Sequence, residues 1–179
     1  FGEIIESHQQ AVDFVRDMVE IPVGRKFCTI MTSAAGYPLD KTYYQTIKGM
    51  VTPLDILEDK GTLIIASECS EGLGSSEFRA AQKRLVEFGP SEFLEKLMRK
   101  NLADIDEWQT EIQLKSMRIG NIKLYTTGLD TTDLEVTGVE QVHSVAEAVS
   151  ESIEAHGKRE VAVIPEGPYI VPFSNTVFS

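Results

Sequence analysis

Gln45 and Lys48, with Tyr44 beside them, are the residues whose types and spacing best suit a binding site. They are three residues apart, so they share one face if the segment forms a helix. A Lys ammonium supplies charge and a Gln amide supplies a directional hydrogen bond, a combination that suits a carboxylate or a phosphate. Because Gln and Lys are also common on solvated helix faces, the spacing alone leaves both interpretations open.

The segment Gly72-Leu73-Gly74-Ser75-Ser76 is a second candidate, because backbone amides at the start of a helix can hold an anion. It has no GxGxxG pattern and no P-loop lysine. Glu68, Glu71 and Glu77 also surround it with negative charge. A plain turn is the simpler interpretation.

The other candidates are single residues. Cys69 follows an apolar run and is a candidate nucleophile, but no histidine lies near it in the sequence to activate the thiol. Trp108 is the only tryptophan, and a single tryptophan is more often part of the core than a stacking surface. The histidines His8, His143 and His156 are too scattered to predict a metal site.

Apolar strands alternate with amphipathic helices along the whole chain. The pattern predicts strands over 27–32, 61–67, 121–126 and 160–165, with less clear ones at 134–136 and 140–142. It predicts helices over 3–20, 41–51, 76–87 and 145–155, one after Ser91, and one from Asp104 to Ile119 with a capping box.

The helix that carries the Gln–Lys pair begins at Lys41 in this interpretation, with Asp40 as its N-cap. Tyr44, Ile47 and Val51 lie on one face of it. The helix follows the end of a predicted strand, which is where binding sites of layered α/β proteins lie.

The alternation predicts an α/β fold: a three-layer, Rossmann-like domain with a mostly parallel sheet covered by helices, spanning residues 1–179. Ligands of such sheets bind outside the carboxyl ends of the strands. The loops 33–40 and 68–75 both lead toward that edge.

Composition fits a single soluble domain. The 179 residues are 42% apolar and 25% charged, which is ordinary for a globular protein. Lys and Arg number 17 against 28 Asp and Glu, a net charge of −11. Such an acidic surface argues against nonspecific nucleic-acid binding and against anionic membranes, and no apolar run is long enough to span a bilayer.

Two cysteines, Cys28 and Cys69, make no disulfide framework and fit a reducing compartment, so we expect a cytoplasmic protein. The sequence does not open with a basic segment and an apolar run, which argues against a signal peptide. Because it begins with Phe1 rather than Met, we expect a fragment or a trimmed product.

One long block carries a family resemblance. Residues 33–49 contain Gly36-Tyr37-Pro38-Leu39-Asp40 followed by a Tyr-Gln-x-x-Lys pattern at Tyr44, Gln45 and Lys48. The block resembles the C-terminal domain of the nickel-dependent lactate racemase family. The resemblance extends from about Phe1 to Pro172 and takes in the strand 62–67, the loop 69–74, Trp108 and the segment 165–169.

The resemblance implies a two-domain isomerase that interconverts the stereoisomers of a 2-hydroxy acid in a cleft between its domains. Its cofactor would be a nickel pincer nucleotide, a pyridinium derivative carrying sulfur and nickel, which takes hydride from C2 of the substrate and returns it on the other face. The N-terminal domain of the same protein would supply the tethering lysine, the nickel-ligating histidine and the acid–base histidines.

Carried over by motif, the resemblance implies that Gln45 and Lys48 bind the carboxylate side of the substrate and that Trp108 lies near the cofactor. Tyr44 would line the same cleft, and no residue of this chain is assigned to the metal. Because no stretch resembles the histidine motifs of the N-terminal domain, we expect this chain alone neither to hold nickel nor to racemise a substrate. Two alternatives remain: a non-catalytic α/β binding or interaction module, and a stand-alone α/β enzyme that uses Cys69.

Overall fold

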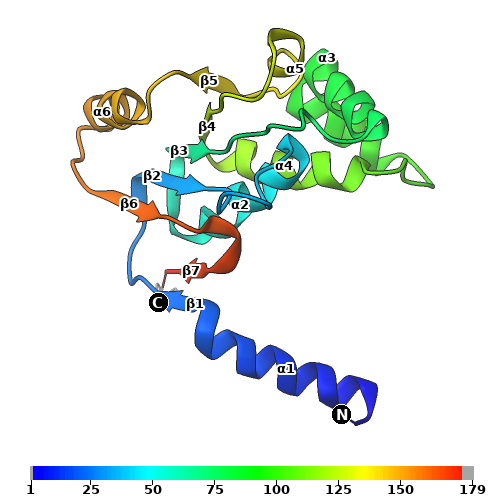
Figure 1. The fold of residues 1–179 in the computed structure, drawn as a ribbon, viewed down its shortest axis with the longest axis vertical. Helices are drawn as coiled ribbons and strands as arrows, with labels where there is room; N and C mark the ends of the chain where they lie inside the picture. The colour runs from blue at the N-terminus through cyan, green and yellow to red at the C-terminus, as the bar shows by residue number, and fades with distance from the viewer. Residues whose placement is uncertain (1, 175–179) are drawn as a thin grey trace.

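The computed structural model describes residues 2–174, and its centre is a parallel sheet with strand order β5-β4-β3-β2-β6 (Figure 1). Every neighbouring pair in this sheet is parallel. Its strands are β2 (Phe27–Ser33), β3 (Leu57–Ala66), β4 (Asn121–Tyr125), β5 (Glu140–Val142) and β6 (Val161–Ile164). The predicted α/β fold class is confirmed.

Helices cover both faces of the sheet. The helices are α1 (Ile4–Val19), α2 (Tyr43–Val51), α3 (Ser76–Met98), α4 (Glu107–Ile119), α5 (Thr131–Leu134) and α6 (Val145–His156), with short 3₁₀ turns η1 (Thr52–Ile56) and η2 (Gly167–Tyr169). On one side α2 and α4 pack against the strands and α3 packs on α4, whereas α6 packs on β2 and β3. Three layers result, as predicted.

The second half of the central strand β3, from Leu63 to Ala66, is continuously apolar because it is covered on both faces. Leu63 and Ile65 join the core beneath α2, whereas Ile64 between them joins Val142 and Ala148 in the core beneath α6. Successive side chains of a strand point to opposite faces, so a strand covered on both sides has no polar face.

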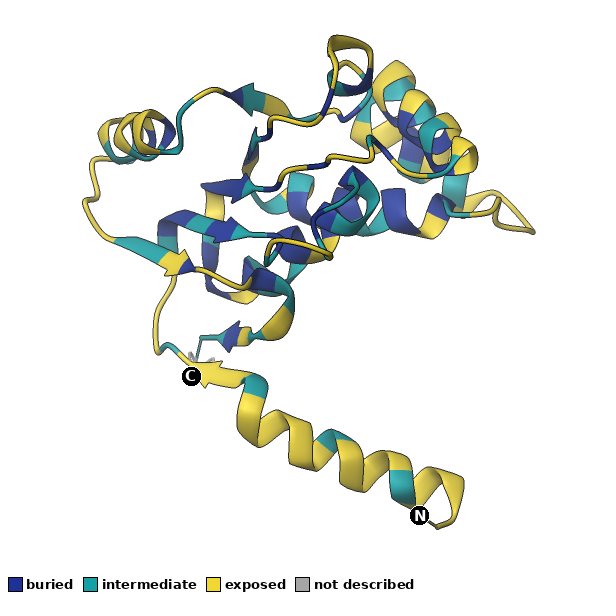
Figure 2. Cartoon of the chain, viewed as in Figure 1, coloured by how far each residue is buried: buried dark blue, intermediate teal, exposed yellow. Residues whose placement is uncertain are grey.

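A second, two-stranded sheet was not predicted. It pairs β1 (Glu20–Pro22) with β7 (Val171–Phe173) in parallel, two segments that lie at opposite ends of the chain. The helix α1 extends from this pair away from the rest of the molecule, and none of its residues is buried (Figures 1 and 2). None of the helices in residues 2–174 combines the length and apolar character that crossing a membrane requires.

Two predicted helix starts are displaced along the chain. The helix α2 begins at Tyr43 with Thr42 as its N-cap, because the Asp40 carboxylate instead accepts a hydrogen bond from the Glu68 amide at 3.2 Å. The helix α4 begins at Glu107 rather than Asp104. One half of the predicted capping box is present there, since the Asp104 amide donates to the Glu107 carboxylate at 3.1 Å.

The two helices predicted over 76–87 and after Ser91 are confirmed, because α3 consists of two helical parts that meet at Gly89, where the backbone is not helical (φ 74°, ψ 164°) ahead of Pro90. One further prediction is corrected. The predicted strand at 134–136 is wrong, because Asp130 caps α5 by accepting a hydrogen bond from the Asp133 amide at 2.8 Å.

Candidate functional site

The helix α2 turns the predicted site residues outward. Its buried face consists of Tyr43, Thr46, Ile47, Gly49 and Met50. Lys48 is exposed, and Tyr44 and Gln45 are half-buried. Residues three and four apart are neighbours on a helix surface, so this helix brings the three side chains together on one face.

The predicted buried face of this helix is therefore partly wrong. Ile47 is buried as predicted, but Tyr43 occupies the core position expected for Tyr44. The Tyr43 hydroxyl donates to the Thr137 carbonyl at 3.2 Å, so the phenol keeps a hydrogen-bond partner inside the core. Desolvation by burial raises the pKa of Tyr43 well above its ordinary value. Tyr44 is thereby left at the surface.

Within residues 2–174, the side-chain amide of Gln45 and the Lys48 ammonium have no hydrogen-bond or ion-pair partner, because the only bonds that Gln45 makes to Thr42 are from its backbone amide. The backbone amides at the start of α2 are all engaged, since Tyr43 and Tyr44 donate to the Gly72 and Leu73 carbonyls, each at 3.0 Å. The amides of the next two residues donate to the Thr42 carbonyl. An anion at this helix would therefore bind to side chains and not to the helix terminus.

Trp108 lies beside this face although it is far away in the sequence. Its ring centroid is 6.0 Å from that of Tyr44, edge-on at 89°, and Tyr44 makes a second edge contact with Phe78 at 5.2 Å. The side-chain amide of Gln109 also donates to the Tyr44 carbonyl at 2.8 Å, which ties α4 to α2. The structure thus brings Tyr44, Gln45 and Trp108 onto neighbouring elements.

Trp108 is 48% exposed, so the core interpretation of this residue is wrong. Tyr44 is less accessible, and burial raises its pKa, with a further contribution from the Asp106 carboxylate. The phenol therefore stays protonated at neutral pH and is a hydrogen-bond donor. Together the two rings form an aromatic wall next to the Gln–Lys face.

The glycine segment 72–76 is a turn that supports Tyr44. Gly74 has a φ of 122°, and a Cβ at this position would stand 3.1 Å from the Cβ of Tyr44. Ser75 caps α3 by accepting a hydrogen bond from the Phe78 amide at 3.0 Å. The turn interpretation is favoured over an anion cradle, because these groups are used in packing and capping.

Cys69 is fully buried, and its Sγ lies 3.4 Å from the hydroxyl oxygens of both Thr46 and Ser67. A nucleophilic thiol has to be reached by its substrate and ionised by a neighbouring base or cation. Burial among neutral hydroxyls provides neither condition, which argues against the alternative of an enzyme that uses Cys69.

A cavity of about 500 Å³ lies at the carboxyl edge of the sheet and was not predicted residue by residue. Ser33, Asp40, Ser67, Glu68 and Glu166 are among its polar lining residues. Neither Gln45 nor Lys48 lines it. The rule that ligands of parallel sheets bind at this edge is the signal that points to it.

The three histidines remain apart. His8 lies on α1, His143 precedes α6, and His156 at the end of α6 has its Nε2 3.1 Å from the Thr62 hydroxyl. In the described part of the chain, no three or more His, Cys, Asp and Glu side chains are grouped in a way that could hold a metal ion.

Comparisons with known proteins identify the relatives of this chain. The family model for the lactate racemase C-terminal domain matches residues 25–171. The chain is 24% identical over 174 residues to the lactate racemase of Thermoanaerobacterium thermosaccharolyticum, covering 95% of this chain and 40% of that protein. It is 25% identical over 169 residues to the lactate racemase of Lactiplantibacillus plantarum, covering 93% of this chain and 39% of that protein.

The fold also matches a solved structure, that of the lactate racemase apoprotein from Thermoanaerobacterium thermosaccharolyticum, with a TM-score of 0.78 and 23% identity. The match covers 92% of this chain and 40% of the solved chain. The present chain therefore spans about two fifths of the length of these relatives. Because the family model covers most of the sequence, the chain belongs to the lactate racemase C-terminal domain family.

Proposed function

We propose that this chain is the C-terminal domain of a lactate-racemase-like enzyme and contributes one wall of an interdomain cleft that binds a 2-hydroxy acid. The observation that carries the proposal is the outward face of α2, where the side chains of Gln45 and Lys48 have no partner among the described residues 2–174 and lie beside the Tyr44–Trp108 pair. Membership of the family supports the same assignment.

In this proposal Lys48 and Gln45 bind the substrate carboxylate. The ammonium provides a charge-assisted hydrogen bond and the amide a second, directional one. Two contacts to one carboxylate fix its position and leave C2 with a defined orientation. Racemisation requires that orientation, because hydride has to leave one face of C2 and return to the other.

Trp108 and Tyr44 would face the nickel pincer nucleotide. The half-exposed indole of Trp108 fits contact with a flat pyridinium ring, and the Tyr44 phenol offers a hydrogen-bond donor next to it. When bound, that nucleotide would supply the hydride acceptor. The residues of this face include no nickel ligand, so we assign tethering, metal ligation and acid–base chemistry to the N-terminal domain of the same protein.

Under this proposal, residues 1–179 form one domain of a larger cytoplasmic enzyme. The chain by itself would then be inactive. Stoichiometric nickel bound to the isolated chain, or racemisation by it, would contradict that part. The other open function is a non-catalytic α/β module that uses the same face to bind a carboxylate. Both functions share the binding face, so turnover has to be measured as well as affinity.

The test compares Lys48→Ala with Lys83→Ala in the full-length protein. Lys83 is an exposed lysine on α3 and serves as the matched control. A charged hydrogen bond contributes about 1.5–3 kcal/mol, so we expect Lys48→Ala to lower kcat/KM for a 2-hydroxy acid by about 10- to 100-fold.

Unchanged kcat/KM in Lys48→Ala would contradict the assignment of this residue. Carboxylate binding that depends on Lys48, in a full-length protein that shows no turnover with any 2-hydroxy acid tried, would favour the binding module.

A further inference from the structure

Trp108 follows a loop, residues 99–106, that projects from the molecule between α3 and α4 (Figure 1). The apolar side chains in this loop are open to solvent, Leu102 at 83% and Ile105 at 71% exposure. A loop with so little apolar packing has to be held by other contacts if the helix that follows it is to start in a fixed place.

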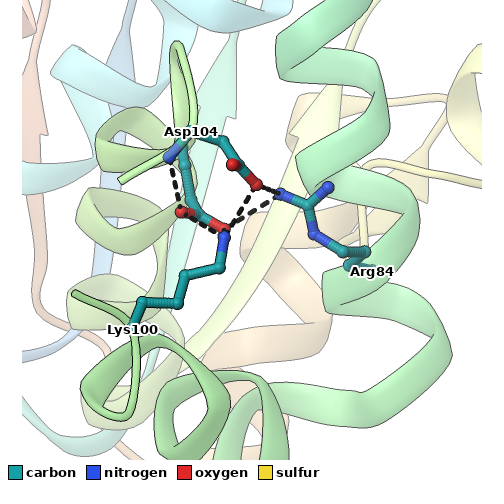
Figure 3. A network of polar contacts seen from close by, with 4 residues as sticks. Arg84, Lys100 and Asp104 are labelled. Atoms are coloured by element: carbon teal, nitrogen blue, oxygen red, sulfur yellow. Dashed lines mark hydrogen bonds and ion pairs between the residues drawn. The ribbon is translucent and has the colours of Figure 1, made fainter. Parts of the chain in front are cut away.

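Four charged side chains supply those contacts (Figure 3). The Glu107 carboxylate, 2% exposed, accepts hydrogen bonds from Arg84 at 2.9 Å, from Lys100 at 2.7 and 2.8 Å, and from the Asp104 amide at 3.1 Å. The Asp104 carboxylate accepts from the same two cations, at 3.1 Å from Arg84 and 2.7 Å from Lys100. Two positive and two negative groups therefore balance one another.

The cluster joins three parts of the chain. Arg84 comes from α3, Lys100 and Asp104 from the two ends of the loop, and Glu107 from the first turn of α4. Burial alone would raise the pKa of Glu107, but the hydrogen bonds from Lys100, the Asp104 amide and Arg84 together hold it below its ordinary value. Glu107 is therefore charged at neutral pH and keeps all of these contacts.

A second contact fixes the same turn from the opposite side. Asp106 has a left-handed backbone with a φ of 60°, and its carboxylate accepts a hydrogen bond from the Ser75 hydroxyl at 2.6 Å. Ser75 is also the N-cap of α3. The residues on both sides of this short turn are thus tied to α3 just before Trp108.

We propose that Arg84, Lys100, Asp104 and Glu107 form a positioning cluster that fixes the first turn of α4 and thereby holds the Trp108 indole against Tyr44. A half-exposed ring with one edge contact does not hold itself in place, so its orientation depends on the backbone that carries it. The catalytic meaning of this position rests on the proposed function, but the positioning does not.

A buried carboxylate between two cations also adds little to the stability of the fold, because well-packed apolar residues in its place often give a protein of equal or higher stability. Such a cluster does impose one geometry, since it is satisfied only when all its partners are in place. This contrast is consistent with a role in orientation.

The test uses the chain itself, because Trp108 is its only tryptophan and its fluorescence reports one position. The variants are Glu107→Gln and Arg84→Met. The control is Glu160→Gln, which removes an exposed ion pair with Arg25 of 2.8 Å elsewhere in the molecule. Arg84 is 33% exposed, so Arg84→Met keeps the test available if Glu107→Gln fails to fold.

We expect the cluster variants to shift the Trp108 emission to longer wavelength and to increase its quenching by acrylamide, while circular dichroism stays unchanged. Because Trp108 is already 48% exposed, complete release would raise the quenching constant about twofold. The control should leave emission and quenching as they are. Unchanged quenching in folded Glu107→Gln and Arg84→Met would overturn the proposal.

Activity of the full-length protein separates positioning from general stability. If Glu107 acts through Trp108, adding Glu107→Gln to Trp108→Ala lowers kcat/KM no further than Trp108→Ala does. Additive losses would overturn the positioning role. The cluster variants could change the Trp108 fluorescence while Trp108→Ala keeps full activity. That result would support the positioning of Trp108 by the cluster and would contradict the proposed role of Trp108 in the cleft.

Discussion

The helices α1 and α2 are both amphipathic, but only α2 packs its apolar face against the core. Five residues of α2 are buried and none of α1 is. Three large apolar side chains of α1, those of Ile4, Phe14 and Met18, are 65–80% exposed. Periodicity therefore identified two helices correctly, but it carried no information on which of them has a partner surface.

The difference shows where stability and function are concentrated. The helix α2 is held by the glycine turn, by the core beneath it and by Gln109 of α4, so its outward face is presented by a rigid support. The helix α1 is connected to the rest of the molecule through the β1–β7 pair. We expect changes in α2 to alter global stability and changes in α1 to act locally.

The largest expected effect comes from truncating one apolar side chain in each helix. Ile47 is fully buried, so Ile47→Ala should lower the free energy of unfolding by about 3 kcal/mol through lost burial and a new cavity. Phe14 is 65% exposed, so Phe14→Ala should change it by less than about 0.5 kcal/mol. Urea unfolding of both variants measures the two values.

A loss of stability in Phe14→Ala that matches the loss in Ile47→Ala would break the comparison. It would mean that the apolar face of α1 is covered in solution. Sedimentation of the wild-type chain would then distinguish a second copy from a contact within the chain.

The next effect concerns two glycines with positive φ. Gly74 supports α2, and a Cβ there would meet Tyr44 at 3.1 Å, whereas Gly24, between β1 and β2, has no atom within 4 Å of the same position. A left-handed backbone conformation costs about 1–2 kcal/mol for alanine, so we expect Gly24→Ala to lower the free energy of unfolding by that amount. Gly74→Ala should lose about 1 kcal/mol more because of the added contact.

Thermal unfolding of both glycine variants checks this order. The quenching of Trp108 fluorescence adds a second measurement, since only Gly74→Ala should disturb the ring pair that Tyr44 forms with Trp108. Equal losses in the two variants, with unchanged quenching, would show that the turn does not support Tyr44.

Prediction from sequence succeeded where local rules decide the outcome. The helix predicted over 145–155 is α6, which Ser144 caps by accepting a hydrogen bond from the Glu147 amide, and the apolar run within 61–67 belongs to a strand as predicted. The Gln45–Lys48 pair was placed on one helix face by spacing alone. Each of these depends on residues a few positions apart.

Prediction failed where the outcome depends on distant segments. The strands β1 and β7 are three residues each and form only because their partner lies at the other end of the chain. Trp108 is half-exposed rather than part of the core, and the turn before it is bound by Arg84 and Lys100, partners that nothing in the local sequence identifies. Asp40 likewise bonds to Glu68 instead of capping the next helix.

The smallest expected effect compares the two N-caps. The Thr42 hydroxyl accepts from the Gln45 amide at 3.3 Å, and the Glu3 carboxylate accepts from the Ile5 and Glu6 amides at 2.9 and 3.1 Å. Because α2 unfolds together with the core, Thr42→Ala should lower global stability by about 1 kcal/mol. Because α1 has no buried residue, Glu3→Ala should leave the unfolding midpoint unchanged and reduce only the helical circular-dichroism signal.

Amide hydrogen exchange locates each effect along the chain. Thr42→Ala should speed exchange in α2 and in the strands beneath it, whereas Glu3→Ala should speed exchange within α1 alone. If Glu3→Ala also speeds exchange in β2 and β3, α1 contributes to the cooperative core. The separation between a local helix and a supported one would then have to be abandoned, because the two helices would unfold as one unit.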